Sequence, residues 1–301
     1  MHRNGVRIED TFAEAFDMKC TRLIVTAMDS IWAEHCAAAK SGFGTSVIDC
    51  KIEIDIERSL PASEPPDGRP GIALLAFAMS GDELEKQLVR RAGQCCLTCP
   101  TTALFAGLPA DASGKRIALG KSLRYFGDGH QISKVIDQER YWRIPVMDGD
   151  FICAHDAPRD DGIGGGNFLL TARDINAASR AARAAMSAIE SMPGVITPFP
   201  GGVVRSGSKV GSKYKRLVAS TNDAYCPTLR GTTKSKLTDD ENAVLEIVID
   251  GLSFEAIRDA MRAGIGTACD ACGEHGLISV PAGNYGGKLG RHHFHLHEIL
   301  S

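Results

Sequence analysis

The sequence lacks any long hydrophobic run and any excess of basic residues. No apolar stretch approaches the roughly 18 residues that a membrane-spanning helix needs, and the N-terminus does not show the basic-then-apolar order of a signal peptide. The formal net charge of −3 argues against nucleic acid as a partner, because nucleic-acid binders carry a basic stripe. We therefore expect a cytoplasmic protein with no membrane and no nucleic-acid partner.

The signatures of several enzyme classes are also missing. The chain has no G-x-S-x-G elbow, no H-E-x-x-H motif and no evident catalytic triad. The glycines of residues 162–166 precede an expected strand instead of opening a helix, which argues against a dinucleotide-binding turn. A cysteine nucleophile, Cys95 or Cys226, stays open as an alternative, although the sequence shows no base beside either.

Cysteine is plentiful, but its spacing does not predict a metal site. Ten cysteines in a chain without a signal peptide indicate reduced thiols instead of disulfide bonds. The pairs Cys96/Cys99 and Cys269/Cys272 lie about 170 residues apart, far beyond the spacing of a zinc knuckle. The histidines of residues 292–297 alternate with apolar residues, as in a strand with one polar face. We expect no bound metal.

The hydrophobic pattern repeats one order of elements, which predicts an α+β fold of two lobes, residues 1–148 and 149–301. In the first lobe we expect helices from Asp29 or Ser30 to Lys40 and from Ser80 to about Ala92, with strands at residues 22–28, 46–56, 71–79 and 116–126. In the second lobe we expect helices from Asp174 to about Ser191 and from Ser253 to Met261, with strands at residues 167–172, 195–204, 242–250 and 277–280. Both lobes follow the order βαββαβ of tandem ferredoxin-like units, whose antiparallel sheets are flanked by helices.

Short sequence echoes favour a duplication. Residues 26–29 (TAMD) match residues 171–174 (TARD), and residues 91–93 match residues 262–264 (both RAG). Chance similarity in an alanine-rich chain is the alternative. The second lobe is longer between these points, and we place its insertion at about residues 206–240, which are rich in Gly, Ser, Lys and Thr.

Residues 198–215, PFPGGVVRSGSKVGSKYK, lead into this insertion. Their glycines let the backbone approach a ligand closely, and their hydroxyl and ammonium groups suit an anionic or amide-rich ligand. The spacing argues against a nucleotide-binding loop, because Ser208 separates Gly207 from Lys209.

Glu246 interrupts an otherwise apolar strand, AVLEIVI. The period of two places Glu246 on one face with Val244 and Val248. If both faces of the strand are covered, burial raises the proton affinity of the carboxylate, as a general acid near neutral pH requires. A solvent-facing strand, on which Glu246 is a surface charge, is the alternative.

Motifs along nearly the whole chain carry a resemblance to one family. They are NGVRIEDTFAEAF (4–16), GFGTSVI (42–48), PDGRPG (66–71), FGDG (126–129), GGNF (165–168), PFPGG–SGSKVGSKYK (198–215), STN–YCPT (220–228), NAVLEIVIDGL (242–252) and AGNYGGKLG (282–290). The sequence resembles formylmethanofuran:tetrahydromethanopterin formyltransferases. The resemblance implies two ferredoxin-like lobes that pack together, dimers or tetramers, and substrates bound in clefts between lobes and subunits.

The resemblance also implies an activity without a cofactor. A formyl group moves between N5 of tetrahydromethanopterin, or its dephospho form, and the amine of methanofuran or a methylofuran analogue, so both carriers are substrates. The family's active-site glutamate falls on Glu246, for which we expect a role as catalytic acid in direct transfer through a tetrahedral oxyanion. The expected substrate-binding residues are Phe199, Ser206, Ser208, Lys209, Ser212, Lys213, Tyr214, Lys215, Asn284 and Tyr285.

Abundant Ala and Arg, without strong acidity, argue against a salt-adapted archaeal enzyme. Together with the resemblance, this composition leads us to expect a methylotrophic bacterium as the source. There the resemblance implies that the protein works with hydrolase subunits and passes formyl from the pterin to the furan carrier. A non-catalytic carrier-binding subunit of a larger formyl-hydrolysing complex is one alternative, and a zinc-dependent hydrolase is another.

Overall fold

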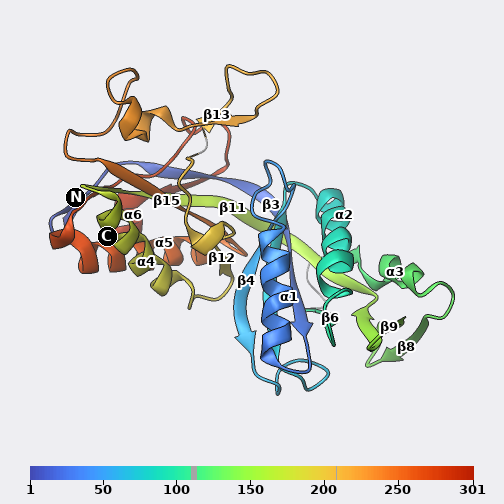
Figure 1. Ribbon diagram of the computed structural model, residues 1–301. Coiled ribbons are helices and arrows are strands. Elements are labelled where there is room, and N and C mark those ends of the chain that lie inside the picture. Colours follow the sequence, from blue (N-terminus) through green and yellow to red (C-terminus); the bar gives the residue numbers. More distant parts are fainter. Residues whose placement is uncertain (110–113, 208) are drawn as a thin grey trace. The chain divides into compact units, whose positions relative to one another are not determined.

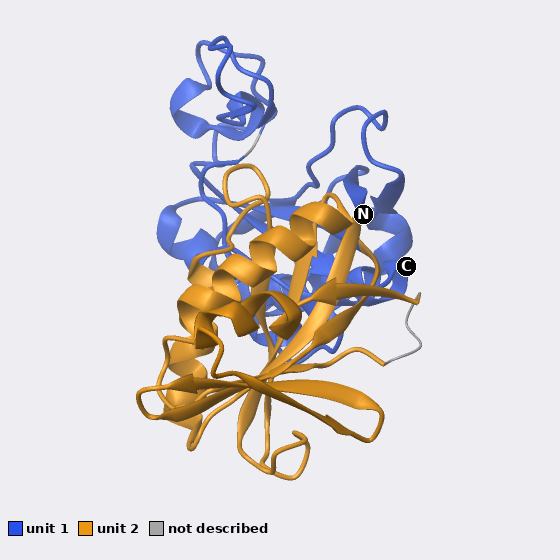
Figure 2. Cartoon of the chain, turned by 90° about the vertical axis from the view of Figure 1, so that its right-hand side faces the viewer, with its two compact units in different colours: residues 1–17, 163–301 blue, residues 18–162 orange. Residues whose placement is uncertain are grey.

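A computed structural model describes residues 1–109, 114–207 and 209–301 of an α+β fold (Figure 1). The chain forms two compact units (Figure 2): unit 2 is Met18–Gly162, and unit 1 combines Met1–Asp17 with Ile163–Ser301. The units therefore do not follow a single cut near residue 148. The reason is that the N-terminal strands pair with strands near the C-terminus, inside unit 1.

The central sheet of unit 2 has the strand order β4–β5–β3–β6, and all neighbours are antiparallel. These strands are β4 (Glu53–Leu60), β5 (Gly71–Ala78), β3 (Phe12–Thr26) and β6 (Ala103–Ala106). Every residue of β5 is buried, and helices α1 (Ser30–Gly42) and α2 (Gly81–Arg91) pack beside it. The helices thus remove the apolar face of this sheet from water.

Two expected strands of unit 2 are wrong in part. The run at residues 116–126 forms only β7 (Lys115–Ala118), because the backbone N–H groups of Leu119 and Lys121 both donate to the carbonyl oxygen of His155 and turn the chain. The helix α3 (Gly120–Leu123) and a 3-10 turn (Arg124–Gly127) follow.

The run at residues 46–56 becomes a strand only at Glu53, because Cys50 N–H donates to Ser46 in a turn. Sequence patterning also missed β6 and the antiparallel meander beside it. The meander consists of β8 (Ile132–Ile136), β9 (Glu139–Val146) and β10 (Gly149–Ala154), and β10 pairs with β6 in parallel.

The four expected helix starts are confirmed. Asp29, Ser80, Asp174 and Ser253 each accept a hydrogen bond from a backbone N–H in the first turn of α1, α2, α4 (Ile175–Ile189) and α5 (Phe254–Cys272). Such caps satisfy donors that have no partner inside the helix.

The expected ends of α1, α2 and α4 lie within two residues of the observed ends, but the expected end of α5 is wrong. Helix α2 continues into a π-helical turn (Ala92–Cys96) that contains Gly93. Helix α5 runs past Met261 and through Gly264, where an added Cβ would lie 2.7 Å from Cδ1 of Ile189 on α4. Gly264 therefore permits close helix packing instead of ending a helix.

A buried lysine lies among thiols in unit 2. Lys40 is 0% exposed on α1, and its Nζ donates to Sγ of Cys96 at 3.8 Å. The Cys36 thiol, which donates a hydrogen bond, and then the Lys40 ammonium lower the pKa of Cys96. Since a buried ammonium needs a counter-charge, we infer a thiolate–ammonium pair.

All ten cysteines are free. The described part of the chain contains no group of three or more His, Cys, Asp or Glu side chains placed to hold a metal ion. Nor does any helix in residues 1–109, 114–207 and 209–301 have the length and apolar character needed to cross a membrane.

The central sheet of unit 1 has the strand order β12–β15–β11–β16, again antiparallel throughout. These strands are β12 (Val195–Ile196), β15 (Ala243–Gly251), β11 (Asp156–Ala172) and β16 (Leu277–Val280). On the far side of β16 lie β2 (Val6–Ile8), in parallel, and then β1 (His2–Arg3). The expected strand at 195–204 is interrupted by a 3-10 turn (Pro200–Gly202), where Gly201 and Gly202 have positive φ.

The histidine-rich segment forms β17 (His292–His295), which pairs with the start of β3. Helix α6 (Leu296–Leu300) begins directly after it, so the expected alternation ends before His297.

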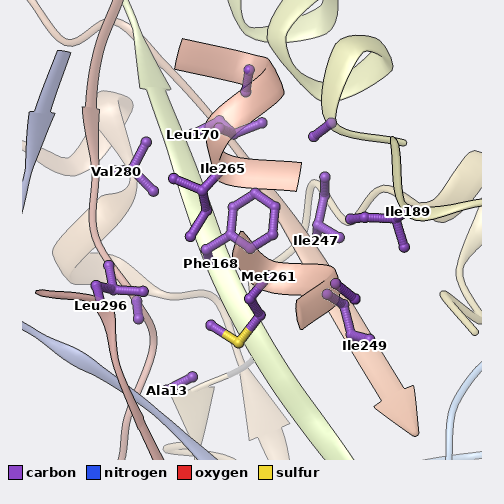
Figure 3. Packing of buried hydrophobic residues seen from close by; sticks show 14 of the residues in the cluster. Ala13, Phe168, Leu170, Ile189, Ile247, Ile249, Met261, Ile265, Val280 and Leu296 are labelled. Carbon is purple, nitrogen blue, oxygen red and sulfur yellow. The ribbon is translucent and has the colours of Figure 1, made fainter. Parts of the chain in front are cut away.

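The core of unit 1 lies between this sheet and helices α4 and α5. Figure 3 shows Phe168 of β11 packed among Ile247 of β15 and Met261 and Ile265 of α5, all fully buried. The opposite face of β15 carries residues 244, 246 and 248, because side chains alternate along a strand. The helices thus cover one face of β15. The opposite face, which carries Glu246, is not packed against these helices.

Candidate active site

Glu246 lies inside the sheet of unit 1, with a backbone neighbour on each side. Leu169 of β11 is its register partner on one side. On the other side, Val204 N–H donates to the Glu246 carbonyl oxygen at 2.7 Å, and Glu246 N–H donates to the Val204 carbonyl oxygen at 2.9 Å. The segment at residues 198–215 is therefore anchored directly at Glu246.

A small pocket of about 100 Å³ lies at Glu246. The sheet supplies its floor, and the insertion of residues 206–240, together with the two residues before it, supplies most of its wall. The lining residues are Leu169, Val204, Arg205, Ser206, Gly207, Thr221, Asn222, Tyr225, Cys226, Pro227, Val244, Leu245 and Glu246. The volume is large enough for a small functional group such as a formamide, but not for a whole coenzyme.

The pocket changes the acidity of Glu246. Loss of water around the half-buried carboxyl raises its pKa to about 7. Among the described residues, no lysine or arginine lies within ion-pair distance of Glu246 to reverse this shift. At neutral pH a large fraction of molecules therefore carries Glu246 as a neutral acid that can donate a proton.

Tyr285 is the second sequence-predicted residue near this carboxyl. Burial and then the charge of Glu246 raise the pKa of the Tyr285 phenol, which places the two side chains within electrostatic reach. The Tyr285 ring also lies 5.9 Å from the ring of Phe16, between centroids. Ser206 lines the pocket itself. Ser206 and Glu246 thus share one pocket, and Tyr285 lies within electrostatic range of Glu246 without lining that pocket.

The other predicted residues do not line this pocket. Lys209 pairs with Asp223 at 2.8 Å. The Ser212 hydroxyl accepts a hydrogen bond from Tyr214 N–H, and the side chain of Tyr214 is exposed. Lys213 and Lys215 are exposed as well.

Phe199 precedes the 3-10 turn Pro200–Gly202 and does not line the pocket either. The Asn284 side chain donates to the carbonyl oxygen of Phe12 and accepts from Gly286 N–H. Ser208 lies outside the described residues.

Among the pocket residues with polar side chains, sequence reasoning missed five as binding candidates. They are Arg205, Thr221, Asn222, Tyr225 and Cys226. The motif STN–YCPT contains four of them. Their position in an insertion beside a Gly-rich loop could have identified them as binding candidates, because such loops often carry binding residues. Cys226 Sγ lies 3.1 Å from the Thr228 hydroxyl, and among the described residues no base contacts it.

These features define a class of protein before any comparison: an α+β enzyme whose pocket presents a carboxylic acid with a near-neutral pKa. Residues 1–146 match the family model of formylmethanofuran-tetrahydromethanopterin formyltransferase, and residues 149–299 match the model of the proximal lobe of the same family. The chain belongs to this family. It is a formyltransferase.

Similar proteins support this assignment over the whole chain. A formylmethanofuran–tetrahydromethanopterin formyltransferase from Rhodopirellula baltica is 61% identical, covering 98% of this chain and 92% of the relative. The formyltransferase/hydrolase complex from Methylorubrum extorquens, solved with methylofuran, contains a chain with 48% identity and a TM-score of 0.95, covering 100% of this chain and 99% of that one. The formyltransferase from Methanosarcina barkeri has 45% identity and a TM-score of 0.91, covering 99% and 100%.

Proposed function

We propose that this chain transfers formyl directly between N5 of tetrahydromethanopterin, or its dephospho form, and the amine of methanofuran or a methylofuran-type carrier, with Glu246 as the catalytic acid. The observation that carries the proposal is the pocket at Glu246, in which loss of water raises the carboxyl pKa to about 7. The methylofuran bound in the related Methylorubrum extorquens complex supports the class of carrier.

The acid form of Glu246 fits the chemistry of a formamide donor. The attacking amine adds to the formyl carbon, and the carbonyl oxygen becomes an oxyanion that needs a hydrogen-bond donor already in place. Collapse of this intermediate breaks the bond to the departing nitrogen, which takes up one proton while the attacking nitrogen loses one. Glu246 donates to the oxyanion and relays this proton, so it ends the cycle in the acid form.

We also propose that the substrate contacts come from the insertion and from the loop at Tyr285. The candidates are Phe199, Ser206, Ser208, Lys209, Ser212, Lys213, Tyr214, Lys215, Asn284 and Tyr285. The hydroxyls can donate to amide and carboxylate oxygens of the carriers, and the exposed lysines can offset their carboxylate charges. No cofactor takes part in this scheme, because both carriers are substrates.

Lys213→Ala should raise the Michaelis constant of at least one carboxylate-bearing carrier about twofold to fivefold, as expected for loss of one exposed charge pair. The effect should shrink at high salt, and kcat should stay unchanged. Steady-state kinetics at two salt concentrations tests this. Lys134→Ala, which removes an exposed lysine in unit 2, is the matched control. Equal Michaelis constants in wild type and Lys213→Ala would remove Lys213 from the site.

The pH dependence of kcat tests the acid form. The folded pKa of Glu246 is raised to about 7, so the active acid is present below this pH and is lost as the pH rises through it. We therefore expect kcat to fall tenfold for each pH unit well above 7. A stopped assay of formyl transfer with saturating purified carriers measures this fall of kcat at high pH, which is the high-pH limb of the profile. A kcat that stays constant through pH 7 and above would contradict an acid role for Glu246.

The isolated chain decides between this function and a non-catalytic carrier-binding subunit. Purified chain, mixed with a formylated carrier and the unformylated partner, should produce the exchanged formyl product without any other subunit. Binding of both carriers with no transfer would favour the binding subunit. We further propose that the chain forms a dimer or tetramer. We also propose that it joins hydrolase subunits, because the Methylorubrum extorquens relative is a subunit of a formyltransferase/hydrolase complex. The cytoplasmic location stays a prediction.

We propose, finally, that residues 1–148 and 149–301 are duplicated ferredoxin-like lobes. Two observations support this. Both central sheets place their four strands in the order second, third, first, fourth along the chain, with a helix after the first strand and another after the third. The two family models meet between residues 146 and 149.

A further inference from the structure

The loop at residues 282–290, AGNYGGKLG, carries Tyr285 but contains no helix or strand. A loop of this kind normally exposes its backbone N–H groups to water. Here four of them instead converge on one buried side chain, Glu14 of β3, which is 1% exposed. Glu14 Oε2 accepts from Tyr285 N–H at 2.7 Å and Gly287 N–H at 2.8 Å, and Oε1 accepts from Leu289 N–H at 2.6 Å and Gly290 N–H at 2.7 Å.

The electrostatics keep Glu14 charged. Burial by itself raises the pKa of a carboxyl group, but the four backbone donors outweigh it, and the net pKa of Glu14 lies below its ordinary value. A carboxylate with four N–H donors uses nearly all its acceptor capacity. Glu14 is therefore a fixed anion inside a cradle of amides, unlike the proton-exchanging Glu246.

The loop sequence suits this cradle. Gly286 and Gly287 have φ of 84° and 72°, values that glycine reaches without strain. This turn directs the N–H groups of Tyr285 and Gly287 to Glu14, while Gly286 N–H donates to Oδ1 of Asn284. At Gly290 an added Cβ would lie 2.3 Å from the carbonyl oxygen of Ala15, so only glycine lets the loop approach β3 this closely. At the other end, Asn167 of β11 accepts from Gly283 N–H at 2.6 Å and donates to its carbonyl oxygen. The loop is held at both ends.

The loop starts one strand away from Glu246, because Leu169, the register partner of Glu246 on β11, donates its N–H to the carbonyl oxygen of Pro281 at 2.7 Å. We propose that Glu14 is a positioning residue for formyl transfer, because it closes this loop onto β3 and so holds Tyr285 on the side of the sheet where Glu246 lies. The inference rests on the proposed role of Glu246. Glu14 touches no reacting atom. It fixes the backbone of Tyr285, and the Tyr285 side chain then excludes water from Glu246 and keeps it in the acid form at neutral pH.

Glu14→Gln tests the proposal, because glutamine keeps the size of the side chain but loses the charge and turns one acceptor into a donor that faces N–H groups. We expect kcat to fall about 10- to 100-fold, as for displacement of catalytic groups by about an ångström. The midpoint of the high-pH limb of kcat should move below 7, because Glu246 regains water. Hydrogen exchange should become faster at the four amides that donate to Glu14, because these hydrogen bonds protect them from solvent. The amides are those of Tyr285, Gly287, Leu289 and Gly290.

Two further variants separate positioning from a loss of stability. Glu57→Gln in unit 2 also breaks a buried carboxylate's hydrogen bonds, to Arg22, and should lower the unfolding temperature without moving the pH midpoint. Tyr285→Ala keeps the backbone bonds to Glu14 and should reproduce the shift of the midpoint. If Glu14→Gln does not fold, Glu14→Asp, which is too short to reach all four amides, takes its place.

A Glu14 variant with accelerated amide exchange but an unmoved midpoint would overturn the positioning role, as would wild-type amides that already exchange freely. Glu246→Gln, assayed in parallel, separates the two ideas. If Glu246→Gln keeps full turnover, the acid role of Glu246 is wrong, and the positioning inference falls with it. If Glu246→Gln is inactive and Glu14→Gln keeps the wild-type midpoint, only the inference about Glu14 is wrong.

Discussion

Glu246→Gln is expected to lower kcat about 100- to 10,000-fold, the range that loss of a general acid produces. Glutamine matches the size of the neutral acid, so the β15 backbone bonds to Val204 and Leu169 stay in place. The amide can still donate a hydrogen bond to the oxyanion, but it cannot give up a proton to the departing nitrogen. Carrier binding, measured at equilibrium, should therefore change little while turnover is lost.

Glu190→Gln is the matched control for this experiment. Glu190 is an exposed glutamate at the end of α4, and the same change there should leave kcat unaffected. The residual activity of Glu246→Gln should also have lost the high-pH limb near 7, because the titrating group is gone. Wild-type turnover in Glu246→Gln would refute the proposed mechanism.

Cys96→Ala is expected to destabilise the protein by about 3–5 kcal/mol, because it strands the ammonium of Lys40 in the core without a partner. Chemical denaturation measures the loss. Cys153→Ala is the matched control: Cys153 is equally buried in the same core, but its thiol donates only to a backbone carbonyl. We expect about 1 kcal/mol for that smaller change, in which no charge is left unpaired.

The double variant Lys40→Met/Cys96→Ala tests the charged pair further. Removing both charges often restores stability, because the desolvation cost of the pair disappears with its attraction. We therefore expect the double variant to be more stable than Cys96→Ala alone. Equal losses in Cys96→Ala and Cys153→Ala, with no recovery in the double variant, would show that Lys40 and Cys96 do not form a charged pair.

Local signals predicted the helices well and the strands less well. The four N-cap residues could be read because a cap needs only its own side chain and the next turn. The strand expected at residues 116–126 was wrong beyond Ala118, because the turn there depends on the distant carbonyl oxygen of His155. The expected helix end at Met261 was wrong for a similar reason, since α5 continues through Gly264, where the contact that requires glycine comes from Ile189 on another helix.

The candidate site shows the same division. Glu246 could be found because a carboxylate in an apolar strand conflicts with its local pattern. Glu14 could not, although it lies in one of the family motifs. The amides that it binds are 271 to 276 residues away along the chain, and an alternating strand with one glutamate resembles any half-exposed strand.

By itself, the sequence determined the family, the α+β class, the helix starts and the glutamate most suited to act as an acid, because each rests on side chains close together in the chain. Only the tertiary structure decided which residues surround that glutamate. Folding brings Val204 and the insertion to β15, and the resulting loss of water raises the pKa of Glu246 to about 7. Desolvation depends on every neighbour at once, so no single motif encodes it.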